Sequence, residues 1–414
     1  MHKSTSFALL SFLAAAVYAP SIWAHADEPL AENIVVLPDT VVVKTNFGVI
    51  GSHFDGFVCE EAFLGGETFE VAVLGPDEWV AIGENGIWVT RDGCSFDKVG
   101  DVSVAPTDAA VDLESGLVAF VLNSPDDGGI WLSDDRGSTW TRILERADFQ
   151  WTGVRFASSE KVIVSAYDRL NAGAAHLMEI TLPGGGLVDR ELEGLSYPYL
   201  LDARGDSVLW LGRSETQNVY FGSMFDLTLN IRPITSWPTD ARIISDTKIV
   251  VAGMLQQRGL SEGDLVDGAF VWNDLASTTT ALCVTPDGDS YLVCAQRRFD
   301  EADVMRVNGA ELLPAFLFTD LTGPRDCPIG SEVQATCPVV WRELARTLGL
   351  APALDDADVG VDAGDDADAG PGLDADAGGT PIIRLPSDNE TCSTAHGTPI
   401  LLSLLGLFGM RRKK

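Results

Sequence analysis

Two stretches of the chain repeat one another: Gly-Ile-Trp-Val-Thr-Arg-Asp-Gly-Cys-Ser-Phe at 86–96 and Gly-Ile-Trp-Leu-Ser-Asp-Asp-Arg-Gly-Ser-Thr-Trp at 129–140. The two Gly-Ile-Trp starts lie 43 positions apart, and a weaker copy occupies residues 48–59. Each copy is a short β-rich run followed by a turn rich in Gly and Asp. A period of about 40 residues built in this way is typical of one four-stranded blade of a β-propeller.

The rest of the body carries fainter copies of this pattern. Short β-rich runs such as Val162–Tyr167 and Lys248–Ala252 recur, and turn residues such as Pro183–Gly186 and Pro286–Gly288 separate them. We therefore predict an all-β fold, a β-propeller, over residues 27–353. The length and the period predict about seven four-stranded blades, and blades without a clear turn leave six or eight open.

A short helix and an acidic stalk are expected after the blades. The spacing of Trp341, Leu344 and Leu348 predicts one amphipathic helix. Residues 354–391 then form an Asp/Ala/Gly-rich linker, whose part at 354–380 holds nine Asp and no Lys or Arg. Such a segment cannot offset its chain entropy by burial, so we expect a disordered, extended stalk. Calcium binding is the alternative, but the sequence lacks an Asp-x-Asp-x-Asp-Gly loop with a Glu at its twelfth position.

The N-terminal end predicts export. Residues 1–26 combine a basic start, an apolar run and an Ala-His-Ala sequence, as a cleavable signal peptide does. A membrane anchor is the alternative, but the apolar run is shorter than the roughly 20 residues that a spanning helix needs.

The C-terminal end predicts display at a cell surface. In residues 392–414, Cys392 precedes a short apolar stretch and the basic end Arg411–Lys414. This arrangement resembles the C-terminal sorting signals of surface proteins in myxobacteria and related Gram-negative bacteria, which implies that Cys392 is the site of cleavage and modification. A hydrophobic tail packed on the domain is the alternative. We expect a protein at the cell surface or outer membrane of a Gram-negative bacterium, or released from it, that meets the membrane only through this segment.

The charge excludes one class of partner. The chain has 61 acidic against 28 basic residues, and residues 27–353 alone carry a net charge of −28. Such a surface repels phosphate backbones, so no nucleic-acid partner is expected. His53 and His176 are the only histidines left between the two predicted processing sites, which disfavours His-based metal sites and catalytic triads. No cofactor is expected either, because the body lacks a Walker loop and a dinucleotide fingerprint.

The second repeat matches the pattern Ser-x-Asp-x-Gly-x-Thr-Trp completely, through Ser133, Asp135, Gly137, Thr139 and Trp140. In such a turn the Asp can accept hydrogen bonds from backbone amides, the Gly permits a positive φ, and the Trp buries its ring between sheets. The chain therefore resembles the Asp-box (BNR) repeat of sialidase-like β-propellers. The first repeat is degenerate, with Asp92, Gly93 and Phe96 at the matching places. The resemblance implies that these residues lock turns away from the active face and are structural.

Six cysteines of the body are expected to form disulfides, because an even number in an exported chain is typical of disulfide bonding: Cys59, Cys94, Cys283, Cys294, Cys327 and Cys337. Cys283–Cys294 and Cys327–Cys337 are close in sequence, so we expect these pairs within hairpins or loops. Cys59 and Cys94 occupy similar places in neighbouring repeats, which favours a bridge between adjacent blades. Other connectivities stay open. Zinc is disfavoured, because no Cys-x-x-Cys occurs.

No motif for catalysis stands out. The nucleophile elbow Gly-x-Ser-x-Gly is absent. Sialidases carry Arg-Ile-Pro, whereas this chain has Ile231-Arg232-Pro233, and an acidic body is a poor receptor for an anionic sugar. Trp79, Trp151 and Trp237 lie near turn-rich stretches. Burial between blades is the favoured interpretation for each, and stacking on sugars or anchoring a partner is the alternative.

These observations favour a surface-displayed, non-enzymatic β-propeller whose loop face binds a protein, peptide or polysaccharide. The alternative is a carbohydrate-active enzyme of the glycoside hydrolase kind that is not a true sialidase, which needs two carboxylates about 5 to 10 Å apart. A third interpretation is a likeness to the Asp-box propellers that help assemble photosystem complexes, and it rests on the shared repeat alone. No catalytic, metal-binding or cofactor-binding residue is assigned.

Overall fold

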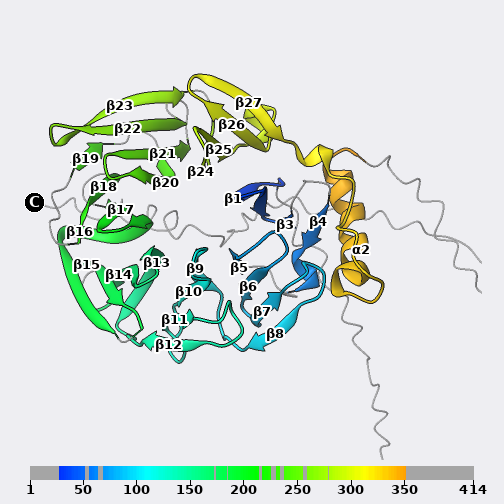
Figure 1. Ribbon diagram of the computed structural model, residues 1–414, viewed down its shortest axis with the longest axis horizontal. Helices are drawn as coiled ribbons and strands as arrows, with labels where there is room; N and C mark the ends of the chain where they lie inside the picture. Colours follow the sequence, from blue (N-terminus) through cyan, green and yellow to red (C-terminus); the bar gives the residue numbers. More distant parts are fainter. Residues whose placement is uncertain are drawn as a thin grey trace, which may run out of the picture.

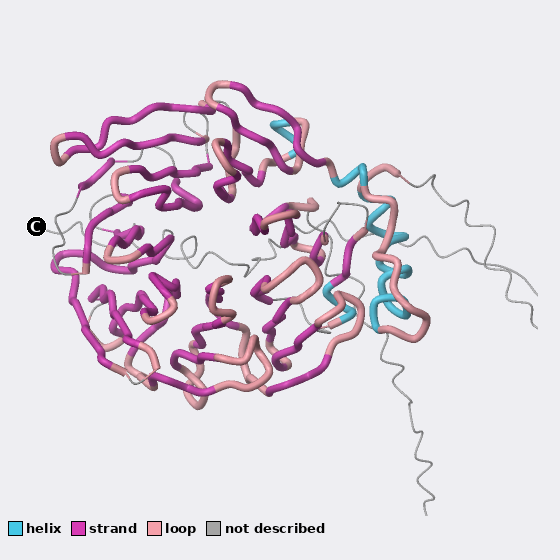
Figure 2. The backbone as a smooth tube through the Cα atoms, in the orientation of Figure 1, coloured by secondary structure: helices cyan, strands magenta, loops and turns pink. Residues whose placement is uncertain are grey.

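Six antiparallel sheets are arranged in a ring in the computed structural model (Figure 1). The structure describes residues 28–350 except 52–55, 64–68, 172–173, 184, 214–216, 225–229, 234–236, 255–258 and 278. The expected signal peptide, stalk and sorting segment, with Cys392, lie outside the described residues. The predicted fold is confirmed: the chain folds as an all-β propeller, in which strands predominate and helix is confined to a few segments (Figure 2).

The first three sheets have four strands each, and strand order follows the chain. The Gly-Ile-Trp repeats form the third strand of the second and third sheets. The strands are β1 (Ala31–Leu37), β2 (Thr40–Thr45), β3 (Gly48–Ile50) and β4 (Phe57–Cys59); β5 (Phe69–Val73), β6 (Trp79–Gly83), β7 (Gly86–Thr90) and β8 (Asp97–Gly100); β9 (Pro106–Asp112), β10 (Leu117–Leu122), β11 (Gly129–Ser133) and β12 (Thr141–Leu144).

A seven-stranded sheet and two further four-stranded sheets complete the ring. The seven strands are β13 (Phe149–Ser158), β14 (Lys161–Asp168), β15 (Ala174–Thr181), β16 (Gly186–Arg204), β17 (Ser207–Arg213), β18 (Gln217–Ser223) and β19 (Asn230–Pro233). The last two sheets contain β20 (Trp237–Ser245), β21 (Lys248–Met254), β22 (Leu260–Val266) and β23 (Ala269–Ala276), and β24 (Cys283–Asp287), β25 (Ser290–Cys294), β26 (Val304–Asn308) and β27 (Glu311–Phe316).

Strand β16 runs through two blades. Its first part pairs with β15 and its second part pairs with β17. Between them Gly194 has a φ of 72° and Tyr197 a φ of 51°, so the backbone bends there. The outer strand of one blade thereby becomes the inner strand of the next. Six sheets are present, and dividing the seven-stranded sheet at this bend gives seven four-stranded units, in agreement with the expected count of about seven with six left open.

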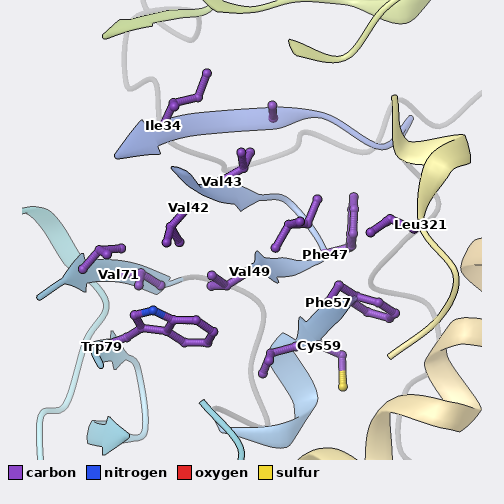
Figure 3. Close-up of a cluster of buried hydrophobic side chains, with 14 of the residues drawn as sticks. Ile34, Val42, Val43, Phe47, Val49, Phe57, Cys59, Val71, Trp79 and Leu321 are labelled. Carbon is purple, nitrogen blue, oxygen red and sulfur yellow. The ribbon is translucent and has the colours of Figure 1, made fainter. Parts of the chain in front are cut away.

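Apolar clusters between consecutive sheets hold the blades together. The cluster between the second and third sheets contains Val80, Val89 and Phe120. The largest cluster joins β1–β6 to the last sheet and to the C-terminal segment, and Figure 3 shows Phe57 and Leu321 within it. Burial of a large apolar side chain stabilises a fold by about 1.5–3 kcal/mol, so these clusters stabilise the contacts between blades.

The described helices are few and short apart from α2. They are α1 (Arg297–Asp300), α2 (Glu332–Thr347) and the 3-10 turns η2 (Glu60–Ala62) and η3 (Phe318–Asp320). Helix α2 confirms the helix that the apolar stripe predicts. Ser331 caps its N-terminus by accepting a hydrogen bond from the Gln334 N–H, and Val333, Cys337 and Leu344 form its buried face against η2 and β4.

Residues 317–350, called the clasp below, return from the last sheet to the first two (Figure 1). Pro324 forms a parallel bridge with Phe57 of β4. The Phe57 N–H donates to Gly323 O at 3.2 Å, and the Arg325 N–H donates to Phe57 O at 2.9 Å. Arg325 also pairs with Asp77 of the β5–β6 connection at 2.7 Å. The clasp therefore extends the first sheet and reaches the second.

All six cysteines expected in disulfides form them. The Cys283–Cys294 pair is confirmed and links the adjacent strands β24 and β25. The other two expected pairs are wrong, because the bridges are Cys59–Cys337 and Cys94–Cys327. The clasp brings Cys337 beside the end of β4 and Cys327 beside the turn after β7, so each cysteine of the clasp has a partner in a blade. Sequence distance misled the prediction, since the return of the chain decides which thiols meet.

Candidate functional site

The ring has two faces that differ in their connections. Because the strands of each blade are antiparallel, the connections from first to second and from third to fourth strands lie on one face, called the turn face. The connections from second to third strands and from blade to blade lie on the opposite face, called the loop face. The repeated turns after β7 and β11 therefore lie on the turn face.

The turn after β11 is closed by its own side chains. The Ser133 hydroxyl donates to Asp135 at 2.8 Å and accepts from the Gly137 N–H at 2.8 Å. Asp135 also accepts from the Thr139 N–H at 2.8 Å and from the Thr139 hydroxyl at 2.7 Å. Desolvation raises the pKa of Asp135, but these hydrogen bonds outweigh it and hold the pKa below its ordinary value. The carboxylate is thus committed to the turn.

Close packing explains the glycine and the tryptophan of this turn. Gly137 has a φ of 91°, and a Cβ at this position would lie 2.4 Å from Cγ2 of Val80 in the second sheet. The Trp140 ring lies 4.8 Å from the ring of Phe120 and packs against the cluster between the second and third sheets. The turn therefore fits against the neighbouring blade.

The turn after β7 has a similar hydrogen-bond pattern. Asp92 accepts from the Cys94 N–H at 2.8 Å and from the Ser95 N–H at 2.9 Å, and the Gly93 N–H donates to the Thr90 hydroxyl at 2.8 Å. The Phe96 ring packs on Phe63 with a centroid distance of 4.9 Å. Asp92 therefore closes its own turn, as Asp135 does in the next blade.

A carboxylate joins the two turns across the blades. Glu78 pairs with Arg91 of the first turn and with Arg136 of the second, and the Arg136 Nε–H donates to it at 2.9 Å. Arg91 also donates to the Arg136 carbonyl at 3.1 Å. This part of the turn face is a structural staple between the second and third sheets.

Three aspartates on first strands connect consecutive blades, an arrangement called the Asp relay below. Each accepts from the N–H of its own following residue, and its second oxygen accepts from an N–H of the next blade. The distances across blades are 2.9 Å from Asp108 to the Val154 N–H, 2.7 Å from Asp202 to the Ile243 N–H and 3.0 Å from Asp240 to the Val284 N–H. Asp108 is on β9, Val154 on β13 and Asp240 on β20. Figure 1 shows these three strands around the middle of the ring.

Cations accompany these inner carboxylates. Arg155 pairs with Asp108 and donates to the Leu201 carbonyl at 2.8 Å, and Arg242 pairs with Asp240. Lys44 lies 3.2 Å from Glu32 and 3.3 Å from Glu70.

The burial of these groups shifts their ionisation. Burial raises the pKa of Asp108 and Asp202 against the opposing effect of Arg155 and Arg242. Burial lowers the pKa of Lys44, but the carboxylates around it outweigh burial and raise the pKa. Each of these inner charges is therefore engaged in holding blades together.

Among the described residues, no group of three or more His, Cys, Asp or Glu side chains is arranged to hold a metal ion. Within the same residues, no helix has the length and apolar character needed to cross a membrane.

The two tryptophan candidates whose side chains the structure describes lie in the core. Trp79 and Trp151 are each 1% exposed and lie in clusters between sheets, so the favoured burial between blades is confirmed for both and the alternative of stacking on a ligand is wrong. Their aromatic surface is used between blades. The side chain of Trp237 lies outside the described residues, and Arg232 lies on β19 with only its backbone described.

The loop face of the seven-stranded sheet carries aromatic and apolar side chains near the end of β14 and the bend of β16. This rim patch consists of Tyr167 at the end of β14, Leu170 in the β14–β15 connection and Tyr197 at the bend of β16. The rings of Tyr167 and Tyr197 meet edge to face at 4.8 Å. Leu170 is 86% exposed and Tyr197 is 49% exposed. Sequence reasoning missed this patch, because none of the three residues belongs to the repeated motif.

The Asp relay was also missed, although the sequence holds a signal for it. Residues 106–109 and 238–241 both read Pro-Thr-Asp-Ala, and Asp202 is also followed by Ala. This second repeat lies on first strands, whereas the turn motif lies after third strands. The two copies start 132 positions apart, about three blade periods, so a search for any repeated tetrapeptide would have found them.

Comparisons with known proteins support the fold and no more specific family or function. No family model matches the sequence, and no curated protein matches it. The WD40 repeats of RRP9 superpose with a TM-score of 0.51 at 8% identity, covering 66% of this chain and 89% of that chain. YCF48 bound to D1 peptide gives a TM-score of 0.42 at 9% identity and covers 59% and 80% of the two chains. An ancestral GH74 enzyme gives 0.33 at 10% identity and covers 72% and 55%. At such identities the similarity establishes the β-propeller fold alone.

Proposed function

We propose that this protein is an exported β-propeller, displayed at the cell surface, that acts as a non-enzymatic binding module for a protein, peptide or polysaccharide. The observation that carries the proposal is the use of the inner charges. Asp108, Asp202 and Asp240 bond to neighbouring blades, and Lys44 lies between Glu32 and Glu70. Groups held in this way are poorly suited to proton transfer, because each would have to break a bond between blades to react.

The disulfides support export. Three bridges in the described part of the chain need an oxidising compartment, where such bonds form and persist. The signal peptide expected at 1–26 and the sorting segment expected at 392–414 also favour export to the cell surface. The linker expected at 354–391 follows the clasp in the sequence, so the propeller would be held through the clasp.

We further propose that the repeated turns belong to the Asp-box type. The support is the matching pattern of bonds in two blades, in which a hydroxyl accepts from the glycine N–H and an aspartate accepts from later amides. Both turns lie on the turn face, so the loop face is the surface offered to a ligand.

The proposal is tested by a combined binding and product assay. The mature protein is screened on glycan and peptide arrays, and each ligand that binds is incubated with the protein and examined for products. Retention without turnover is the expected result. Release of reducing sugar, lost in the Asp108→Asn and Glu70→Gln variants, would establish the carbohydrate-active enzyme instead.

A second measurement tests the proposed export and display at the cell surface. N-terminal sequencing of the protein isolated from its own cells should begin at Asp27, and protease added to intact cells should remove it. A protein protected inside the cell and still carrying residues 1–26 would contradict the proposal.

A further inference from the structure

Helix α2 carries two arginines on the face that points away from the propeller (Figure 1). Leu344 is buried against the body, and the exposed Arg342 and Arg346 lie two residues before and after it. At about 100° per residue, both positions lie about 160° from Leu344 around the helix axis, so they share the outer face. They are one turn apart, about 6 Å along the axis.

The two arginines are open to a partner. In the part of the chain that the structure describes, neither Arg342 nor Arg346 forms an ion pair or a hydrogen bond through its side chain. Glu343 lies on the flank of the helix and pairs with neither of them. The similarly exposed Arg136, by contrast, pairs with Glu78. The outer face of α2 is therefore a local cationic surface on a body whose net charge is −28.

The chain leaves α2 through a turn and not along the helix axis. Gly349 has a φ of 74°, and its N–H donates to the Arg346 carbonyl at 3.0 Å. The Leu350 N–H donates to the Ala345 carbonyl at 2.8 Å. These bonds are those of a Schellman motif, which ends a helix at a residue with a positive φ. Leu350 is thereby held beside the last turn of α2, the turn that carries Arg346.

The linker that follows has carboxylates at a spacing that matches the two arginines. Asp356 and Asp358 come six and eight residues after Leu350. In an extended chain, alternate residues point to the same side about 6.6 Å apart, close to the 6 Å between Arg342 and Arg346. Six extended residues span up to about 20 Å, which is enough to return along the last two turns of a helix, about 11 Å. Spacing and reach thus agree with the charges.

We infer that the start of the linker docks on the outer face of α2, with Asp356 against Arg346 and Asp358 against Arg342. An arginine can bind a carboxylate through two parallel N–H···O bonds. A segment tethered by so few residues has a millimolar effective concentration, so exposed ion pairs suffice to hold it. The free part of the stalk then begins after Asp358. This inference goes beyond the proposed binding function, because it concerns how the propeller is joined to its stalk and needs no ligand.

The experiment measures the mobility of a nitroxide spin label in the linker by electron paramagnetic resonance. The label is attached to Ala357→Cys in the oxidised full chain that also carries Cys392→Ser, because the six other cysteines are in disulfides. A matched label at Ala375→Cys lies between Asp374 and Asp376, farther along the linker. At low salt the label at 357 should show an immobilised component that the label at 375 lacks. Salt at 1 M, where the Debye length is about 3 Å, should release it.

Substitution of the arginines tests the helix side of the contact. Arg342→Gln with Arg346→Gln should lower the ratio of immobilised to mobile label at 357 by about fivefold, as expected for the loss of two exposed ion pairs. Arg169→Gln with Arg190→Gln removes the same charge from exposed positions outside the clasp and should leave the ratio unchanged.

Substitution of the aspartates tests the linker side without altering the propeller. Asp356→Asn with Asp358→Asn should release the label at 357, because the carboxylates that bind α2 are lost. A charge exchange provides the sharpest control. Arg342→Glu with Arg346→Glu should release the label, and adding Asp356→Lys with Asp358→Lys to that variant should immobilise it again. Loss of folding cannot produce such a restoration.

Three outcomes would overturn the inference. One is equal mobility of the labels at 357 and 375 at low salt, and another is release by the Arg169 and Arg190 control as large as that by the α2 pair. The third is a mobile label at 357 together with sedimentation on phosphatidylglycerol vesicles that the α2 arginine variant loses, which would assign this face to an anionic membrane surface. None of these results bears on the proposed binding function, which the array screen tests separately.

Discussion

The ring contains two unusual junctions, and they differ in how neighbouring blades are joined. In the seven-stranded sheet, β16 passes from one blade to the next as a single strand, so the junction is made of continuous backbone hydrogen bonds. Where the last sheet meets the first, the described strands of the two sheets do not pair with each other. Contact is made there by apolar packing, by a hydrogen bond of 2.7 Å from the Thr285 hydroxyl to the Ile34 carbonyl, and by the clasp.

The difference shows where a ring of blades needs reinforcement. A junction inside the chain has its two blades linked covalently by a short connection, so closing it costs little entropy. The last junction joins blades at opposite ends of the body, and its closure entropy is much larger. Two disulfides across 278 and 233 residues lie next to this junction, where a cross-link removes the most entropy from the unfolded chain.

Removing the two long bridges should have the largest effect. Replacement of Cys59, Cys94, Cys327 and Cys337 by Ser is expected to lower the free energy of unfolding by about 5 kcal/mol or more, because the closing loop regains its freedom. Replacement of Cys283 and Cys294, which are 11 residues apart, should cost about 3 kcal/mol. Urea unfolding measures both.

Limited trypsin digestion provides the matched readout for this comparison. Without the long bridges, cleavage should occur first after Arg325, Arg342 and Arg346 of the clasp. Equal costs for the two sets of replacements, or an intact clasp in the variant that lacks the long bridges, would show that the bridges do not secure the closing junction.

An ordinary junction is tested at the turn after β11. Gly137→Ala should lower the free energy of unfolding by about 2–4 kcal/mol, because the new methyl group meets Val80 and the backbone has a positive φ. Gly205→Ala is the matched control, since its φ is 60° and nothing lies within 4 Å of the added Cβ. A difference of less than about 0.5 kcal/mol between the two variants would mean that blade contact at this turn contributes little.

The beginning of the clasp should respond to pH. Burial raises the pKa of Asp303 from 3.8 to about 6, although the Phe318 N–H donates to this carboxylate at 2.6 Å. A raised pKa means that the folded protein holds the proton more tightly than the unfolded chain does. The contribution to stability is therefore complete below about pH 4 and is lost as the pH rises to about 6.

The variant Asp303→Asn removes this titration while its amide oxygen can still accept the Phe318 N–H. At pH 7.5 it should be more stable than the wild type by about 1–3 kcal/mol, and at pH 4 the gain should vanish. Denaturant unfolding at the two pH values measures this, with the exposed Asp289→Asn as control. An equal gain at both pH values would contradict a buried, ionised Asp303.

The smallest effect is expected at the staple between the second and third sheets. Glu78→Gln should cost about 1 kcal/mol or less, since the ion pairs with Arg91 and Arg136 are partly exposed and are screened by salt. The loss should shrink as ionic strength increases. If Glu78→Gln lowered the free energy of unfolding more than Gly137→Ala does, the ion pairs of the staple would contribute more to stability than the packing of the turn.

The fold was predictable because the repeated motif is local. Gly-Ile-Trp followed by an Asp and Gly turn fixes a strand and its hairpin within about a dozen residues, so both the element and its period can be found in the sequence. The Cys283–Cys294 bridge was predictable for the same reason, since a short hairpin brings the two thiols together.

Features that depend on the return of the chain could not be predicted in this way. Cys59 meets Cys337 only because the clasp crosses to the first sheet, and no property of the two residues encodes that path. The rim patch likewise depends on the bend of β16, where Tyr197 occupies a conformation that a sequence pattern assigns to Gly or Asn. Among the missed features, the Asp relay alone had a sequence signal, the repeated Pro-Thr-Asp-Ala.

Closure of the propeller by a disulfide-bonded clasp is tested most directly by peptide mapping under non-reducing conditions. The protein is isolated from the surface of its own cells and digested without reduction. We expect complete bridges between Cys59 and Cys337, Cys94 and Cys327, and Cys283 and Cys294. A Cys327–Cys337 bridge would contradict the clasp, and free thiols at these six positions would contradict export.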